Sequence, residues 1–446
     1  MKTCYRTLSL CLSLLLICLP LAACSSEQQQ TPPDPAVSGA FETGPSAPYT
    51  AADAYQEQTD YPYLDVSWGN AVAAASAENG VYFILGDFLW FWDAQSGQTV
   101  PLCHKPECRH NKLPEEEMWK CGAYLRYNCE QHPFLQYYQG SLYCITEFAH
   151  EGEKVSMSDG TYLTKISPDG VYREQLCPID LGSEMSTELI HRGYLYLGVR
   201  VEAADAEGVK KTVFELRRVS MDALDKEPET LLQTNQLNPD ILPYGDHLYI
   251  SGETYDEATG DSGSKVYDYS IKTGRVTELL DNKYLLGVQQ DRLLYREPIT
   301  EEAEKSRTEV TVYAYDLKTG ETSEAVVLPK EEDRYLSVFA DETYFYSFDF
   351  GQSTGGEGGM TFTVYDKSGK LLLEEKAPCR IEAIYFSPGG DYGYLMDRFA
   401  KDEGYAGTIF TMYALNKADG FSFQKLLEGN MAELSPMIRV EEKVNT

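Results

Sequence analysis

The stretch that decides the fold is Pro239–Asp281, PDILPYGDHLYISGETYDEATGDSGSKVYDYSIKTGRVTELLD. Apolar and polar residues alternate along four short runs, and turn residues such as Gly245-Asp246 and Thr273-Gly274 separate them. Alternation is typical of half-buried strands, and Gly-containing pairs between such runs mark hairpins. The stretch therefore predicts one four-stranded antiparallel sheet, with strands over 239–242, 247–251, 266–271 and 276–280.

The same pattern recurs along the chain. A tyrosine marks the second strand of each repeat, at intervals of 46 to 61 residues: Tyr82, Tyr143, Tyr196, Tyr249, Tyr295, Tyr344 and Tyr394. A four-stranded sheet cannot bury both faces alone, and radial stacking of repeats solves this problem. We therefore predict an all-β, seven-bladed β-propeller over 61–440, with six or eight blades as the alternatives. Its blades are expected near 62–101, 134–180, 186–235, 238–281, 284–330, 333–377 and 380–428.

The loops of such a ring divide between two faces. The hairpins that join first to second strands and third to fourth strands are short and share one face. The connections from second to third strands lie on the other face and are expected to be long and acidic, at 150–160, 202–210, 253–264, 297–308, 349–360 and 398–407. Variable loops on a rigid scaffold commonly carry binding functions. We also expect the tail at 431–440 to return to the first blade.

The N-terminus has the features of an export signal. Lys2 and Arg6 precede an apolar run from Leu8 to Leu21, which is too short to span a bilayer comfortably. The following Leu21-Ala22-Ala23-Cys24 resembles the lipobox of bacterial lipoproteins, which implies a signal peptide over 1–23 and a lipid on Cys24. Residues 24–60 are poor in large apolar residues and rich in Pro, Ser and Gln, so we expect a disordered tether. The expected location is extracytoplasmic, anchored to the cell membrane.

The composition restricts the partners. The chain has 446 residues, a formal net charge of −32 and 33 tyrosines. So much negative charge repels the phosphates of nucleic acids, which are excluded as partners. An acidic, soluble surface is the simplest reading of the charge, and a cationic protein, a glycan or a divalent ion is the kind of ligand it leaves open.

An insert at 102–133 interrupts the period between the first two repeats. Cys103, Cys108, His110 and Cys121 give the spacing C-x4-C-x-H-x10-C. Three thiolates and one imidazole match a tetrahedral zinc set. A disulfide-stapled loop suits an exported chain better, and free thiols are the third reading. No cofactor is assured, although zinc or another divalent ion is possible.

The other cysteines and motifs give weaker evidence for a functional site. His104, Cys129 and His132 are spare ligand candidates, whereas Cys144, Cys177 and Cys379 are expected to be buried thiols. The sequences GDSG at 260–263 and GQSTG at 351–355 match protease and hydrolase motifs by letter only. Both fall in expected loops without a following helix, so chance is the better explanation.

The lipobox, the polar tether, the repeated G-x-L-Y hairpins and the insert PLCHKPECRH…CGAY together resemble propeller lipoproteins of anaerobic Gram-positive bacteria that have no characterised function. The repeats are similar to those of low-density-lipoprotein-receptor-like and TolB-like propellers. That resemblance implies no catalytic residues.

Three functions follow as hypotheses. The leading one is a non-catalytic, membrane-anchored binding or scaffold lipoprotein whose protein or glycan ligand approaches the face with long loops. The first alternative is an extracytoplasmic glycan hydrolase or lyase that uses a pair of carboxylates. The second is a metal-handling or redox-sensing lipoprotein built on the Cys/His insert.

Overall fold

The structure is a computed structural model. It describes residues 42–43, 55–56, 59–61, 64–67, 74–125, 134–151, 154–179, 185–204, 210–255, 262–332, 334–350, 360–378, 383–386, 390–399, 409–430 and 434. The predicted signal peptide, Cys24 and most of the predicted tether lie outside these residues, as do Cys129, His132 and Cys379. In the described part of the chain, no helix is long and apolar enough to cross a membrane.

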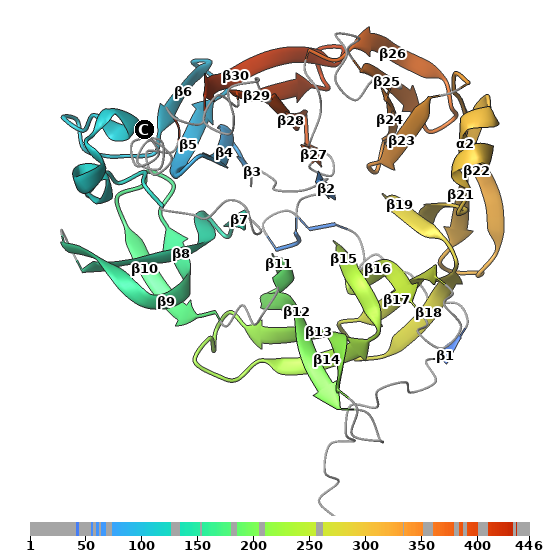
Figure 1. The fold of residues 1–446 in the computed structure, drawn as a ribbon, viewed down its shortest axis with the longest axis horizontal. Helices are drawn as coiled ribbons and strands as arrows, with labels where there is room; N and C mark the ends of the chain where they lie inside the picture. Colours follow the sequence, from blue (N-terminus) through green and yellow to red (C-terminus); the bar gives the residue numbers. More distant parts are fainter. Residues whose placement is uncertain are drawn as a thin grey trace, which may run out of the picture. The chain divides into compact units, whose positions relative to one another are not determined.

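Seven antiparallel sheets follow one another along Ala40–Thr446 and are arranged in a ring, which confirms the seven-bladed β-propeller (Figure 1). The first three blades are β3 (Ala74–Ala77), β4 (Gly80–Leu85), β5 (Phe88–Asp93) and β6 (Gln98–Pro101); β7 (Leu135–Tyr138), β8 (Ser141–Glu151), β9 (Lys154–Ile166) and β10 (Arg173–Pro178); and β11 (Met185–His191), β12 (Tyr194–Ala204), β13 (Lys210–Ser220) and β14 (Glu229–Thr234).

The remaining four blades continue in the same order. They are β15 (Gln236–Tyr244), β16 (His247–Tyr255), β17 (Ser262–Ser270) and β18 (Val276–Asp281); β19 (Tyr284–Gln289), β20 (Arg292–Arg296), β21 (Glu309–Asp316) and β22 (Thr322–Pro329); β23 (Tyr335–Ala340), β24 (Tyr344–Phe350), β25 (Thr361–Asp366) and β26 (Leu371–Lys376); and β27 (Ala383–Phe386), β28 (Tyr392–Phe399), β29 (Ile409–Asn416) and β30 (Ser422–Asn430). The stretch quoted first is thus the fourth blade, with strands somewhat longer than predicted.

Buried apolar clusters join each blade to the next. Phe134 and Leu195, for example, share a cluster between the second and third blades. A cluster containing Phe83 and Met412 joins the first blade to the seventh, and this contact closes the ring. Each sheet therefore buries both faces against its neighbours, which is the reason that the repeats fold as a ring.

The tyrosine alignment was correct in five repeats and wrong in two. In the second blade, Tyr143 pairs with Gln136 two positions after the hairpin closes. The equivalent residue is Leu294 in the fifth blade and Tyr346 in the sixth, in place of the predicted Tyr295 and Tyr344. Leu294 and Tyr346 are completely buried. Several apolar residues lie close together in these strands, so the alternation pattern fits two alignments of each strand. Only the packing of the side chains in the folded protein distinguishes them.

The first blade begins later than predicted, at β3. The earlier strand β2 (Leu64–Ser67) pairs with β27 and so belongs to the seventh sheet, while β1 (Glu42–Thr43) pairs with β18. At the other end of the chain, the carbonyl oxygen of Leu434 accepts a hydrogen bond from the Asp87 amide of the first blade, at 3.2 Å. Both ends of the chain therefore contribute to joining the first and last blades.

All six predicted loops contain some regular structure: five include residues of the flanking strands, and the sixth contains a short helix. Residues 154–160 belong to β9, which forms with β8 a hairpin that extends beyond the blade. The polar sequence there lacks the alternation of a buried strand, so it read as a loop. Residues 301–306 form the helix α2 (Glu301–Ser306), which Thr300 caps by accepting a hydrogen bond from the Ala303 amide.

Candidate metal centre

The insert packs on the first blade. Its described part runs from Leu102 to Leu125 and contains two short 3₁₀ helices, η2 (His110–Lys112) and η3 (Glu115–Lys120). Backbone bonds from the Leu89 amide to the Ala123 carbonyl and from the Leu125 amide to the Asp87 carbonyl, both at 2.8 Å, attach it to the start of β5 and to the turn between β4 and β5. Buried residues of the insert, Met118 among them, extend the cluster that joins the first and seventh blades. The insert is therefore fixed to the rigid ring.

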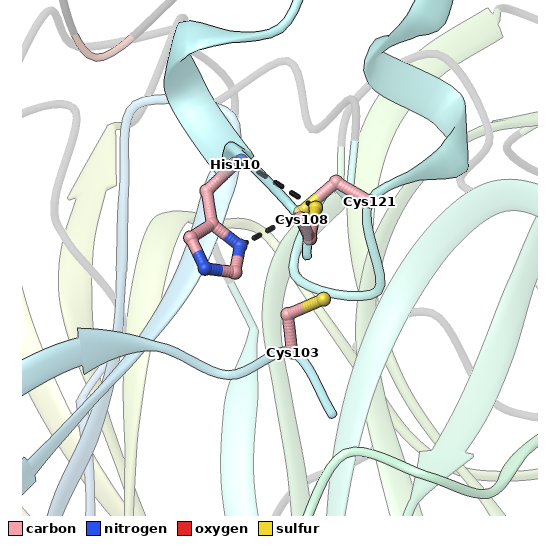
Figure 2. Close-up of side chains that lie close together, drawn as sticks. All are labelled: Cys103, Cys108, His110 and Cys121. Carbon is pink, nitrogen blue, oxygen red and sulfur yellow. Dashed lines mark hydrogen bonds between the residues drawn. The ribbon is translucent and has the colours of Figure 1, made fainter. Parts of the chain in front are cut away.

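The four predicted ligands lie together within this insert. The Sγ atoms of Cys103, Cys108 and Cys121 and a ring nitrogen of His110 all lie within 4.8 Å of one another. Figure 2 shows the side chains converging from separate parts of the insert, with Cys103 leaving β6, Cys108 and His110 before and at the start of η2, and Cys121 after η3. Ligand atoms about 3.8 Å apart would surround a tetrahedral Zn²⁺ with ordinary Zn–S bonds, so only small adjustments separate the cluster from that geometry.

Each of the three sulfurs accepts a backbone hydrogen bond. The amides of Gly122, His110 and Ala123 donate to Cys103, Cys108 and Cys121 at 3.3, 3.4 and 3.4 Å. Such N–H···S bonds stabilise negative charge on sulfur and orient the side chain, as outer-shell contacts do in metal sites. A side chain at Gly122 would have its Cβ 3.3 Å from the Cys103 sulfur, which is a tight approach.

The thiols influence one another. Hydrogen bonding with the Cys121 thiol lowers the pKa of Cys103, and the same interaction, together with burial, raises the pKa of Cys121. Burial also raises the pKa of Cys108. Negative charge is thus favoured on Cys103, and a metal ion would displace the protons of the other two thiols.

His110 completes the set. Its Nδ1 lies 3.6 Å from the Cys121 sulfur, and its backbone has a φ of 51°, a left-handed conformation that a histidine seldom adopts. Four protein ligands would leave no coordination position open, which is typical of structural zinc sites, whereas catalytic sites keep one for water or substrate. With all four positions filled by protein ligands, such a centre would hold the insert in place.

The other candidates lie elsewhere. Cys103, Cys108 and Cys121 are free thiols in the structure, as are Cys144 and Cys177, which are buried in β8 and β10 as expected. His104 is exposed and lies outside the group of four ligands. Ser262 and Gly263 of the GDSG motif are part of β17, and the GQSTG motif lies outside the described residues.

Two inner-strand carboxyls stand out, although sequence reasoning could not choose them. Burial raises the pKa of Glu188 in β11 to about 8. The pKa of Asp240 in β15 is raised to about 6 by partial desolvation, although its side chain is exposed. Asp240 and Thr187 occupy equivalent positions in their blades, because their partners Ser251 and Gly198 do. Leu189 and Ile241, the residues that follow Glu188 and Asp240, both belong to the cluster between the third and fourth blades. Glu188 and Asp240 therefore face away from that seam in opposite directions, and they do not form a pair of the kind that glycan hydrolysis requires.

Comparison with known proteins adds the fold alone. No protein-family model matches the sequence, and no curated protein matches it. Among solved structures, the acylaminoacyl peptidase of Pyrococcus horikoshii superposes with a TM-score of 0.50 at 10% identity, over 81% of this chain and 54% of that one. The propeller domain of the Trilobed protease from Pyrococcus furiosus gives a TM-score of 0.47 at 9% identity, over 80% of this chain and 97% of that one. The chain thus spans about half the length of the peptidase.

Proposed function

We propose that this protein is an extracytoplasmic, lipid-anchored propeller that binds a partner without chemical turnover, and that a zinc centre at Cys103, Cys108, His110 and Cys121 holds its insert in the binding-competent shape. The observation that carries the proposal is the group of four ligand atoms within 4.8 Å of one another. A closed four-ligand set supports a structural metal rather than a catalytic one. The resemblance to propeller lipoproteins supports the anchor at Cys24.

The site suits a binding protein because the metal and the ring have separate tasks. The propeller supplies a rigid scaffold, and the insert rests on the turn between the second and third strands of the first blade, which lies on the face where the sequence predicts the long connections. A metal that crosslinks Cys103 to Cys121 removes much of the conformational freedom of the residues between them. A pre-organised loop loses less entropy when it binds a partner.

Metal analysis tests the centre. The full chain, purified in detergent without oxygen and without chelators, is expected to contain one zinc ion, as measured by elemental mass spectrometry. Replacing Cys103→Ser or His110→Ala should reduce the zinc content to near zero. Cys144→Ser is the matched control, because Cys144 is a buried thiol outside the cluster, and it should keep its zinc. Metal-free protein with disulfides among Cys103, Cys108 and Cys121 would reject the proposal.

Two further measurements test the anchor and the binding role. Wild-type protein in its host should fractionate with membranes and carry lipid on its first mature residue, whereas Cys24→Ser should not. Protein immobilised through its C-terminus should capture a cell-envelope protein or glycan. That capture should disappear in His110→Ala and persist in Cys144→Ser. Capture that is equal in both variants would separate the metal centre from the binding surface.

A further inference from the structure

One arginine in the second blade faces the base of the insert. Arg173 in β10 pairs with Ile166 in β9, and Ile166 pairs with Leu142 in β8. Directly opposed residues of neighbouring strands project to the same face of a sheet. Ile166 and Leu142 belong to the buried cluster that also contains Leu102 and Leu125, the two ends of the described insert. Arg173 therefore projects towards the first blade and the insert.

Placing the Arg173 guanidinium group at this position costs free energy, because part of it is removed from water. The Nε and Nη2 atoms of Arg173 are buried and have no hydrogen-bond partner among the residues that the structure describes. Arginine stays protonated in proteins and has only donors, so two buried guanidinium nitrogens without an acceptor are unfavourable unless negative charge lies near.

Among the described residues, the groups whose negative charge acts on Arg173 are cysteine sulfurs. Burial lowers the pKa of Arg173, and negative charge on Cys144, Cys121 and Cys103 opposes that change. Burial raises the pKa of Cys144 to about 12, so that thiol is neutral near pH 7. The sulfurs that remain to balance Arg173 are the two cluster ligands, Cys121 and Cys103.

We propose that Arg173 is the counter-cation of the metal centre. Three thiolates, one neutral imidazole and a divalent ion have a net charge of −1, which the guanidinium neutralises. The inference rests on the proposed zinc centre and deepens it, because it assigns a residue that is not a ligand and lies in a different blade. Arg173 is a positioning residue: it favours the fully deprotonated thiolate set, and it ties the charge of the insert to the second blade.

Metal titrations of the full chain test this role. Zn²⁺ affinity is measured by competition with a chromophoric chelator, and Co²⁺ is added separately because its sulfur-to-metal absorption bands report thiolate coordination. Arg173→Gln should bind Zn²⁺ about 10- to 100-fold more weakly, the usual effect of losing an outer-shell partner. Arg173→Lys keeps the charge and should stay within about threefold of wild type. Arg217→Gln in the third blade is the matched control and should change nothing.

The outcomes separate the two proposals. If wild-type protein binds no stoichiometric zinc, the zinc centre itself is wrong. If wild-type protein binds zinc and Arg173→Gln binds it equally well, the centre stands and the role of Arg173 is rejected. A loss in Arg173→Lys as large as that in Arg173→Gln also rejects it, since charge would not be the cause. Should Arg173→Gln fail to fold, Arg173→Lys decides: near-wild-type affinity supports the inference, and a loss of tenfold or more overturns it.

Discussion

Arg192, in the first hairpin of the third blade, donates two hydrogen bonds to the Asp60 carboxylate, from Nε to Oδ1 at 2.8 Å and from Nη2 to Oδ2 at 3.1 Å. Its Nη1 also pairs with Asp246 in the first hairpin of the fourth blade. The Arg192 amide donates to the Thr59 carbonyl as well. The residues that lead into the propeller are thus attached to two blades at once, and Asp60 is almost completely buried.

Breaking this attachment should be costly. Arg192→Met leaves the buried Asp60 carboxylate without its cation, and we expect the free energy of unfolding to fall by about 3–5 kcal/mol. Urea denaturation followed by tyrosine fluorescence measures the change. The control is Lys318→Met, which removes an exposed pair with Asp291 and should cost at most about 1 kcal/mol. Equal losses in the two variants would show that the Asp60 contact is no more important than a surface pair.

Acid should weaken the same attachment through His191. Its Nδ1 accepts a hydrogen bond from the Tyr61 amide at 2.9 Å, and its Nε2 donates to the Gly245 carbonyl at 2.7 Å, so the ring must be neutral. Burial lowers its pKa to about 4, although Asp60 and Asp246 act in the opposite direction and Arg192 in the same one. Between pH 6.5 and 4 the unfolded chain binds more protons than the folded one. The free energy of unfolding therefore decreases as the pH is lowered through that window.

The variant His191→Gln isolates this contribution. It should be less stable than wild type at pH 7, but its stability should change less between pH 6.5 and 4. Denaturation midpoints at four pH values measure the slope, with the exposed His104→Gln as the control that keeps the wild-type slope. An unchanged slope in His191→Gln would refute the assignment.

Raising the pH should destabilise the folded state through the buried carboxyl group of Glu188. Its Oε1 is buried and has no partner in the described part of the chain, and burial raises its pKa to about 8. The folded state therefore holds an extra proton from about pH 4.5 to 8, and stability falls as the pH rises through that range. Glu188→Gln cannot ionise and should lose about 4 kcal/mol less than wild type between pH 5 and 9, the amount that this pKa difference gives by linkage. Thermal melts at both pH values test this, and the exposed Glu324→Gln should behave as wild type.

Removing the metal should free the insert while the ring stays folded. Under reducing conditions, a strong chelator should accelerate trypsin cleavage after Arg109 and Lys112 by at least about tenfold, because the segment between Cys103 and Cys121 loses its crosslink. Mass spectrometry of the fragments locates the cuts, and adding Zn²⁺ back should restore protection. Cleavage that is equally fast with and without chelator would mean that the metal does not hold this segment.

The fold could be predicted from the sequence because each blade repeats the same local pattern. Alternation and Gly-centred turns located the strands of the fourth blade, and a similar pattern recurred in all seven repeats, at intervals of 46 to 61 residues. What failed depended on contacts between distant residues. Nothing in Leu64–Ser67 indicates that its partner strand lies in the seventh blade, and the register of Tyr344 and Tyr346 is decided by packing alone.

The ligand residues of the candidate metal centre could also be predicted from the sequence, whereas the residues around them could not. Cys103, Cys108, His110 and Cys121 are close in sequence, and their residue types suggested a metal site as the alternative to the favoured disulfide-stapled loop. Arg173 was not foreseen, because an arginine in a strand normally reaches solvent, and only the strand register turns it towards the insert. The backbone donors at Gly122 and Ala123 likewise depend on local conformation and leave no sequence signal.

The pairing of Leu64–Ser67 with Ala383–Phe386 also sets the order of events in folding. The early strand emerges from the ribosome long before its partner, so its hydrogen-bonding edge stays unsatisfied until almost the whole chain has been made. Six blades can stack while the ring is still open, but the final seam forms only when the two ends meet. Contacts this distant in sequence slow folding, so we infer that ring closure is the late, rate-limiting step and the one most exposed to aggregation.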